Sequence, residues 1–73
     1  MPLRPLSYAD ARRKLLAAGF LEVRAAGSHV KFSKQVENGL RTAILPKHRE
    51  VSIGSLRSVL RQAGITAEDW ERL

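Results

Sequence analysis

Cysteine is absent from this 73-residue sequence, and so is any long hydrophobic run. Without cysteine, neither a disulfide framework nor a thiolate zinc site can reinforce a small core. A chain of this length holds one domain, residues 1–73, with a thin stability margin, so the fold must depend on packing or on a partner. The opening segment 1–6 contains two prolines and a charge, which is typical of neither a signal peptide nor a membrane span. We therefore expect a cytoplasmic protein.

Acidic residues are scarce, since seven Asp and Glu stand against thirteen Lys and Arg and leave a net charge of +6. Three of the seven crowd into residues 68–73, where only Arg72 opposes them, so residues 1–67 carry twelve minus four, or +8. A charge this large on a small body attracts polyanions, and nucleic acid is the commonest polyanion in the cytosol. By itself, the charge favours RNA or DNA only slightly over a role in solubility.

A helix is predicted from about Ser7 to Ala18, where apolar residues recur at steps of three and four. Ser7 with Asp10 resembles a capping box, and Gly19 can take the left-handed conformation that ends helices. The charged residues of this segment should form an exposed basic side, comprising Arg12, Arg13 and Lys14.

Two further helices are predicted toward the end of the chain. One follows the cap residue Ser52 and ends at Gly64, and a short one covers 67–73 behind a second cap pattern at Thr66. Trp70 in the short helix is best explained by core packing, with base stacking as the weaker interpretation.

Three strands are predicted between the first two helices. Alternation after Phe20 indicates a strand that ends near Ala25, and 28–33 reads as a strand with one buried face, leaving His29 and Lys31 on the open face. A polar loop, 34–39, ends in the turn signal Asn-Gly and leads to a third strand over 40–45. The order predicts an α+β fold, a three-stranded antiparallel sheet with helices on one face and a short extra C-terminal helix.

Pairing of the second and third strands would bring the start of one beside the end of the other, so His29 should neighbour residues 45–47. The second helix starts a few residues later, and Gly54 in its first turn has no side chain to block a phosphate. Three segments should then converge on a phosphate site. Its candidate residues are Gly27, Ser28, His29, Lys31, Lys47, His48, Arg49 and Gly54.

The two histidines are candidate acid–base groups, because imidazole titrates close to neutral pH. His48 competes with His29, and spacing alone ranks neither above the other. The histidines do not share a helix face, and no Asp or Glu lies close to His29 along the chain. A metal nuclease needs clustered carboxylates, so we expect no metal or other cofactor.

The sequence resembles the HicA family of bacterial and archaeal toxin domains over nearly its whole length. The elements that carry the resemblance are Leu15, Gly19-Phe20, Gly27-Ser28-His29, Pro46-Lys47-His48, Gly54-Ser55-Leu56 and Leu60 through Gly64. No single element is diagnostic, but the set in this order is fairly specific. The loop before the second helix, longer and basic in the family, is short here.

The resemblance implies a fold like the double-stranded-RNA-binding domain and a ribosome-independent endoribonuclease that degrades mRNA and is held inactive by a HicB antitoxin. It also implies that His29, the histidine of the Gly-Ser-His run, is catalytic. Two alternatives stay open: a non-catalytic RNA-binding module with the same fold and charges, and an interaction domain whose basic face docks an acidic protein.

Overall fold

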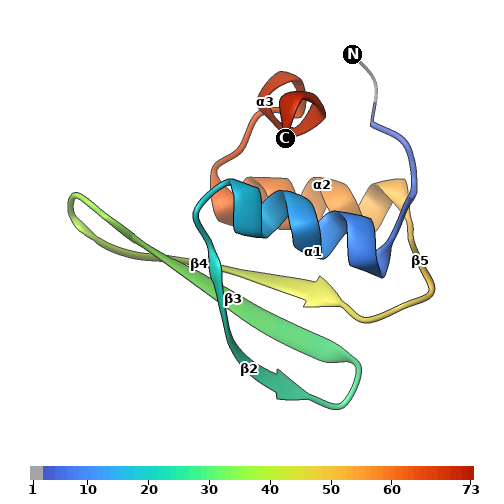
Figure 1. The fold of residues 1–73 in the computed structure, drawn as a ribbon, viewed down its shortest axis with the longest axis horizontal. Coiled ribbons are helices and arrows are strands. Elements are labelled where there is room, and N and C mark those ends of the chain that lie inside the picture. The colour runs from blue at the N-terminus through green and yellow to red at the C-terminus, as the bar shows by residue number, and fades with distance from the viewer. Residues whose placement is uncertain (1–2) are drawn as a thin grey trace.

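The computed structural model describes residues 3–73 and shows the predicted α+β architecture, with a three-stranded antiparallel sheet, helices and a short C-terminal helix (Figure 1). The elements in chain order are β1 (Leu6–Ser7), α1 (Tyr8–Ala17), β2 (Leu21–Ala26), β3 (His29–Val36), β4 (Gly39–Pro46), β5 (Glu50–Val51), α2 (Ile53–Ala63) and α3 (Ala67–Arg72). No helix of the described chain is long and apolar enough to cross a membrane.

The main sheet has the strand order β2-β3-β4, and both connections are tight hairpins. Lys34–Val36 were predicted to be loop, but they continue β3, and only Glu37 and Asn38 form the turn. Lys34 fits in a strand because its ammonium lies 5.8 Å from the centre of the Phe20 ring, which gives a polar side chain an apolar anchor. The hairpin therefore projects well beyond the helices (Figure 1).

One face of the sheet is covered by α1 and α2, which lie side by side across it (Figure 1). Alternate residues of β3 and β4 point into this layer and are fully buried, as the period of two in a strand requires. The core they join consists of Ala11, Leu15, Phe20, Val30, Phe32, Ala43, Leu45, Val51, Leu56, Val59, Leu60, Ala63 and Trp70. Trp70 is 2% exposed, which confirms its predicted place in the core.

Each helix begins at a hydroxyl residue, as predicted. The side-chain oxygens of Ser7, Ser52 and Thr66 accept hydrogen bonds of 3.1 to 3.2 Å from the backbone N–H groups three residues ahead. Gly64 ends α2, as predicted, and its φ of 71° lies in the left-handed region. The local signals in the sequence therefore placed the helix ends to within a residue or two.

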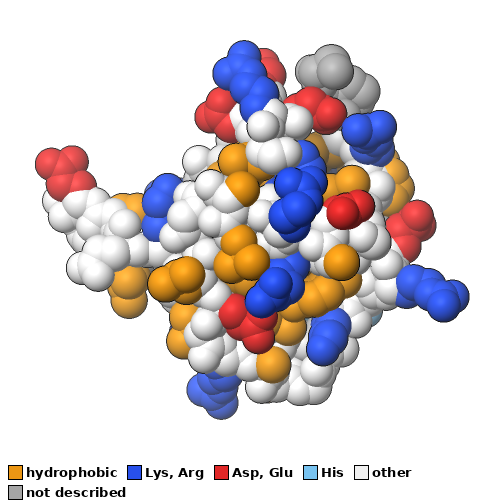
Figure 2. All heavy atoms as spheres, in the orientation of Figure 1, with side chains coloured by type: hydrophobic (Ala, Val, Ile, Leu, Met, Phe, Trp, Pro, Cys, Tyr) orange, Lys and Arg blue, Asp and Glu red, His pale blue; other side chains and the backbone are white. Residues whose placement is uncertain are grey.

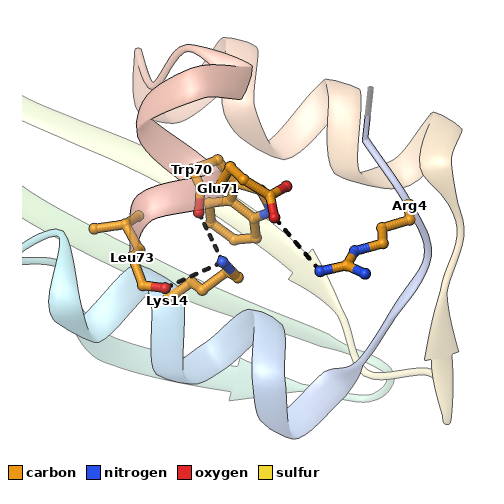
Figure 3. Close-up of polar contacts among 5 residues, drawn as sticks. All are labelled: Arg4, Lys14, Trp70, Glu71 and Leu73. Atoms are coloured by element: carbon orange, nitrogen blue, oxygen red, sulfur yellow. Dashed lines mark hydrogen bonds and ion pairs between the residues drawn. The ribbon is translucent and has the colours of Figure 1, made fainter. Parts of the chain in front are cut away.

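Lys14 was predicted to be exposed, and this prediction is wrong, since the residue is only 9% exposed. Its ammonium donates hydrogen bonds to the carbonyl oxygens of Trp70, at 2.7 Å, and Leu73, at 3.2 Å, and lies 5.6 Å from the centre of the Trp70 ring (Figure 3). Carbonyls in the last turn of a helix attract a cation, so they compensate the burial of the charge. The Trp70 carbonyl also accepts a 3.2 Å hydrogen bond from the backbone N–H of Leu73. Lys14 thereby fastens α3 to α1.

A second, two-stranded sheet was not predicted. In it, β1 pairs with β5, with Leu6 opposite Val51 and Ser7 opposite Glu50. Strands of two residues are too short to show a period in the sequence. Because each strand directly precedes a helix, this pairing places the starts of α1 and α2 at the same end of the molecule (Figure 1).

The predicted β2 is present, but its side chains do not follow the simple alternation of the sequence. The pairing with β3 shifts between Glu22 and Arg24, so Val23 is an extra residue in a β-bulge. All six residues of β2 are exposed, and Leu21 is 69% exposed. The bulge separates side chains that strict alternation would place on one face.

Candidate functional site

His29 is the first residue of β3 and lies exposed on the open face of the sheet, opposite the helices. Its neighbours across the sheet are Ala26 on β2 and Pro46 on β4, which confirms the predicted pairing with the end of β4. The backbone N–H of Lys47 donates a 2.6 Å hydrogen bond to the carbonyl of Ser28 and closes this end of the sheet. The imidazole thus stands on a fixed backbone at a corner of the molecule.

A shallow hollow of about 170 Å³ lies beside the imidazole. Val30 and Phe32 are buried on the helix side, so His29 and Lys31, which alternate with them, belong to the open side. Residues opposite one another in antiparallel strands share a face, so the partners of His29 and Lys31 on β2 and β4 belong to the open side as well. The hollow is lined by Arg24, Ala26, His29, Lys31 and Ile44. It therefore combines an imidazole with two cations on an apolar floor.

Lys31 shares the open face with His29, as predicted, and stands opposite Ile44 on β4. Arg24, on β2, was missed as a site residue. Strict alternation from Leu21 would put Arg24 on the same face as Glu22. Only the bulge at Val23 brings Arg24 opposite Lys31. An arginine two residues before the end of the strand that leads into the Gly-Ser turn was the available signal.

Lys47 does not contribute its side chain to the hollow. Its ammonium lies 5.8 Å from the centre of the Tyr8 ring, at the start of α1. Alternation along β4 agrees, because Leu45 is buried on the helix side and Lys47 is two residues farther. Partial burial raises the pKa of the Tyr8 phenol above its usual 10.0, the Glu22 carboxylate adds to the rise and Arg12 opposes it, so the phenol is neutral at pH 7.

The loop that follows β4 carries His48 and Arg49, both exposed. Neither side chain makes a hydrogen bond or ion pair with residues 3–73. His48 is two residues beyond Pro46, which faces His29 across the sheet, so the loop borders the imidazole without lining the hollow. Gly54 lies in the first turn of α2, where an added Cβ would meet open space. The predicted convergence of three segments is therefore partial.

Gly27 and Ser28 form the two-residue turn that carries the chain from β2 into β3. Gly27 has a φ of 59°, which suits the turns that match the twist of a hairpin. An added Cβ would meet no atom within 4 Å, so conformation rather than crowding favours glycine here. The turn fixes where β3 begins and hence the position of His29.

The β4 side of the hollow is held by a residue that the sequence did not single out. The side-chain oxygen of Gln62, on α2, accepts a 3.0 Å hydrogen bond from the backbone N–H of Ile44, and its nitrogen donates to the hydroxyl of Ser58 at 3.1 Å. The Gln62 backbone carbonyl also accepts a 3.2 Å bond from Arg41. Gln62 satisfies an outward-facing group of an edge strand and joins α2 to the floor of the hollow.

On the face of the molecule that Figure 2 shows, Lys and Arg side chains are scattered, and several acidic side chains lie near α3. The ion pairs of the described chain are Arg4 with Glu71, Arg12 with Glu22 and Arg72 with Asp69. None involves a residue that lines the hollow. Within residues 3–73, no group of three His, Asp or Glu side chains could hold a metal ion. The hollow is thus suited to an anion beside a group able to transfer protons.

The chain is similar to a known family of proteins. A family model described as the HicA toxin of bacterial toxin-antitoxin matches residues 8–65, from the start of α1 to just beyond α2. A search of curated proteins finds no match. The matched segment includes the whole main sheet and every residue of the hollow. The chain belongs to the HicA toxin family.

Proposed function

We propose that this toxin is a ribosome-independent endoribonuclease that cleaves mRNA in the cytoplasm, with His29 as its acid–base residue. The observation that carries the proposal is the exposed imidazole of His29 at the edge of a hollow that also holds Arg24 and Lys31. A phosphodiester backbone can reach an open sheet face without entering a deep pocket. An imidazole supplies acid–base catalysis, and cations beside it stabilise the charge that develops on a reacting phosphate.

In the proposed reaction, the ribose 2′-oxygen attacks the adjacent phosphorus in line with the leaving 5′-oxygen. His29 takes the proton from the 2′-hydroxyl, or gives one to the 5′-oxygen as the P–O bond breaks. The products are a 2′,3′-cyclic phosphate and a 5′-hydroxyl. Lys31 stabilises the charge that develops on the phosphorane-like transition state, where one well-aimed donor is worth a few kcal/mol, roughly.

The residues around the hollow extend the proposed RNA contacts. The turn at Gly27 and Ser28 offers backbone groups beside His29, and the loop with Lys47, His48 and Arg49 offers charge and a second imidazole. Gly54 leaves the first turn of α2 accessible. We propose that a HicB-type antitoxin holds the toxin inactive by covering this corner.

The test is cleavage of RNA by purified protein with a chelator present. His29→Gln should abolish cleavage and keep the fold and much of the RNA affinity, because the side chain is exposed and has no hydrogen bond to residues 3–73. His48→Gln removes the other imidazole of the same corner and should keep cleavage measurable, so the pair of variants ranks the two histidines as acid–base groups. A 2′-deoxy group at the cleaved position should prevent the cut.

Wild-type cleavage by His29→Gln would contradict the proposal. If no RNA is cut but RNA still binds, the protein is a non-catalytic RNA-binding module. Cutting at the 2′-deoxy position would show that water, rather than the 2′-hydroxyl, attacks.

A further inference from the structure

Two cations stand directly opposite each other on the open face of the sheet. Arg24 on β2 pairs with Lys31 on β3, and both are exposed and line the hollow beside His29. Like charges at directly opposed positions of a sheet destabilise it. An arrangement that costs stability in the free protein needs an explanation in what the protein binds.

The β-bulge at Val23 creates this pair. Without the extra residue in the ladder, Val23 would oppose Lys31 and Arg24 would oppose buried Val30, on the helix side. The shift in register moves Arg24 to the open face instead. Bulges of this kind re-aim side chains and are frequent beside active sites.

The same bulge keeps a carboxylate away from the pair. Glu22 stands opposite buried Phe32, so it belongs to the helix side, where it accepts a 3.2 Å bond from Arg12 of α1. A regular strand would place Glu22 and Arg24 on one face. In the described chain, no ion pair involves Arg24 or Lys31, so their charges remain free for an external anion.

We propose that Arg24 and Lys31 hold the phosphate that is attacked, with Arg24 as a second charge-stabilising residue of the reaction. The guanidinium is a planar fork that binds two phosphate oxygens at once, whereas the ammonium of Lys31 acts as a point charge. His29 is two residues from Lys31 on the same face and diagonal to Arg24, within reach of long side chains. The identity of the anion as RNA rests on the proposed function.

Removing the Arg24 charge tests the site directly, with Arg13→Gln as the matched control. Arg13 is an exposed arginine of α1 without an ion pair among residues 3–73, so both variants lose one positive charge. We expect Arg24→Gln to lower kcat by on the order of a hundredfold, and Arg13→Gln to change it little. Arg24→Lys should recover part of the loss, because it restores the charge but not the fork.

Binding is measured separately with an oligoribonucleotide that carries 2′-O-methyl groups and cannot be cut. Arg24→Gln should bind it more weakly than Arg13→Gln does, with the salt dependence of log K reduced by about 0.7 for one lost phosphate contact on a single strand. Thermal unfolding of the free proteins separates the proposed role of Arg24 from a structural role, because loss of a structural residue would lower the Tm. Relief of the repulsion should raise the Tm of Arg24→Gln.

Equal kcat and equal RNA binding in Arg24→Gln and Arg13→Gln would overturn the proposal and leave the pair to a carboxylate of a protein partner. A lower Tm of Arg24→Gln together with lost activity would also overturn it, because Arg24 would then support the fold. Failure of the proposed function looks different. If His29→Gln still cuts RNA while Arg24→Gln loses binding, the result supports the phosphate site and contradicts the acid–base role of His29.

Discussion

The two faces of the main sheet are formed by alternate residues of the same strands, and one face is buried under the helices while the other is open to solvent. On the helix side, Val30 and Phe32 of β3 meet Ala43 and Leu45 of β4, and all four are 0 to 1% exposed. On the open side, His29 and Lys31 of β3 remain in solvent. Substitutions on the helix side should therefore lower the stability of the fold, whereas substitutions on the open side should affect the proposed chemistry.

The largest effect on stability is expected from Phe32→Ala. Phe32 is fully buried, and truncation of a core phenylalanine costs ~3–5 kcal/mol in transfer and cavity terms. A small domain has a total stability near the low end of ~5–15 kcal/mol, so the variant should be largely unfolded. Urea unfolding followed by circular dichroism measures the change. A loss under ~1 kcal/mol would show that the helix side can repack around the missing ring.

Lys14→Met should have an intermediate effect. The thioether keeps the packing of the stem near Trp70 but removes the donor to two carbonyls at the end of α3. Hydrogen bonds to charged groups contribute ~1.5–3 kcal/mol. In the variant the Trp70 carbonyl keeps only the 3.2 Å bond from the backbone N–H of Leu73. Urea unfolding gives the free energy, and hydrogen exchange at the amides of α3 reports local opening. Unchanged exchange in α3 would contradict the role given to Lys14.

Lys31→Gln should have the smallest effect on stability, although it is adjacent to Phe32. The side chain is exposed, and substitutions at such positions usually stay within ~0.5 kcal/mol. Cleavage of RNA should nevertheless fall, because the proposed transition state loses a cation. The same urea titration, run beside the cleavage assay, separates the two readouts. A loss of stability like that of Phe32→Ala would remove the distinction between the faces.

Much of the fold could be predicted because the signals are local. The helix starts are indicated by N-cap residues, Ser7, Ser52 and Thr66, and the end of α2 is indicated by Gly64. The alternation that puts Val30 and Phe32 inside also puts His29 outside, so the open-face placement of His29 and Lys31 followed from the sequence. These features depend on a residue and its near neighbours, which is why a single sequence reveals them.

Other features could not be predicted, because they depend on partners far along the chain. Lys14 is buried by carbonyls far along the chain, since Trp70 is 56 positions away. The Lys47 ammonium lies 5.8 Å from the centre of the Tyr8 ring, which belongs to the start of α1 and is far from Lys47 along the chain. The sequence around a lysine does not show whether a carbonyl or a ring from a distant segment will contact its ammonium.

The sequence by itself determined the helices, the three strands of the main sheet and the face on which His29 stands, since periods and caps are properties of a short segment. Only the tertiary structure decided which cations stand beside that imidazole. The pairing of β2 with β3 includes an extra residue at Val23, and this register gives the hollow Arg24 while it turns Glu22 toward Arg12. Register is set by how two strands and the helix above them pack together, and that information belongs to the whole fold.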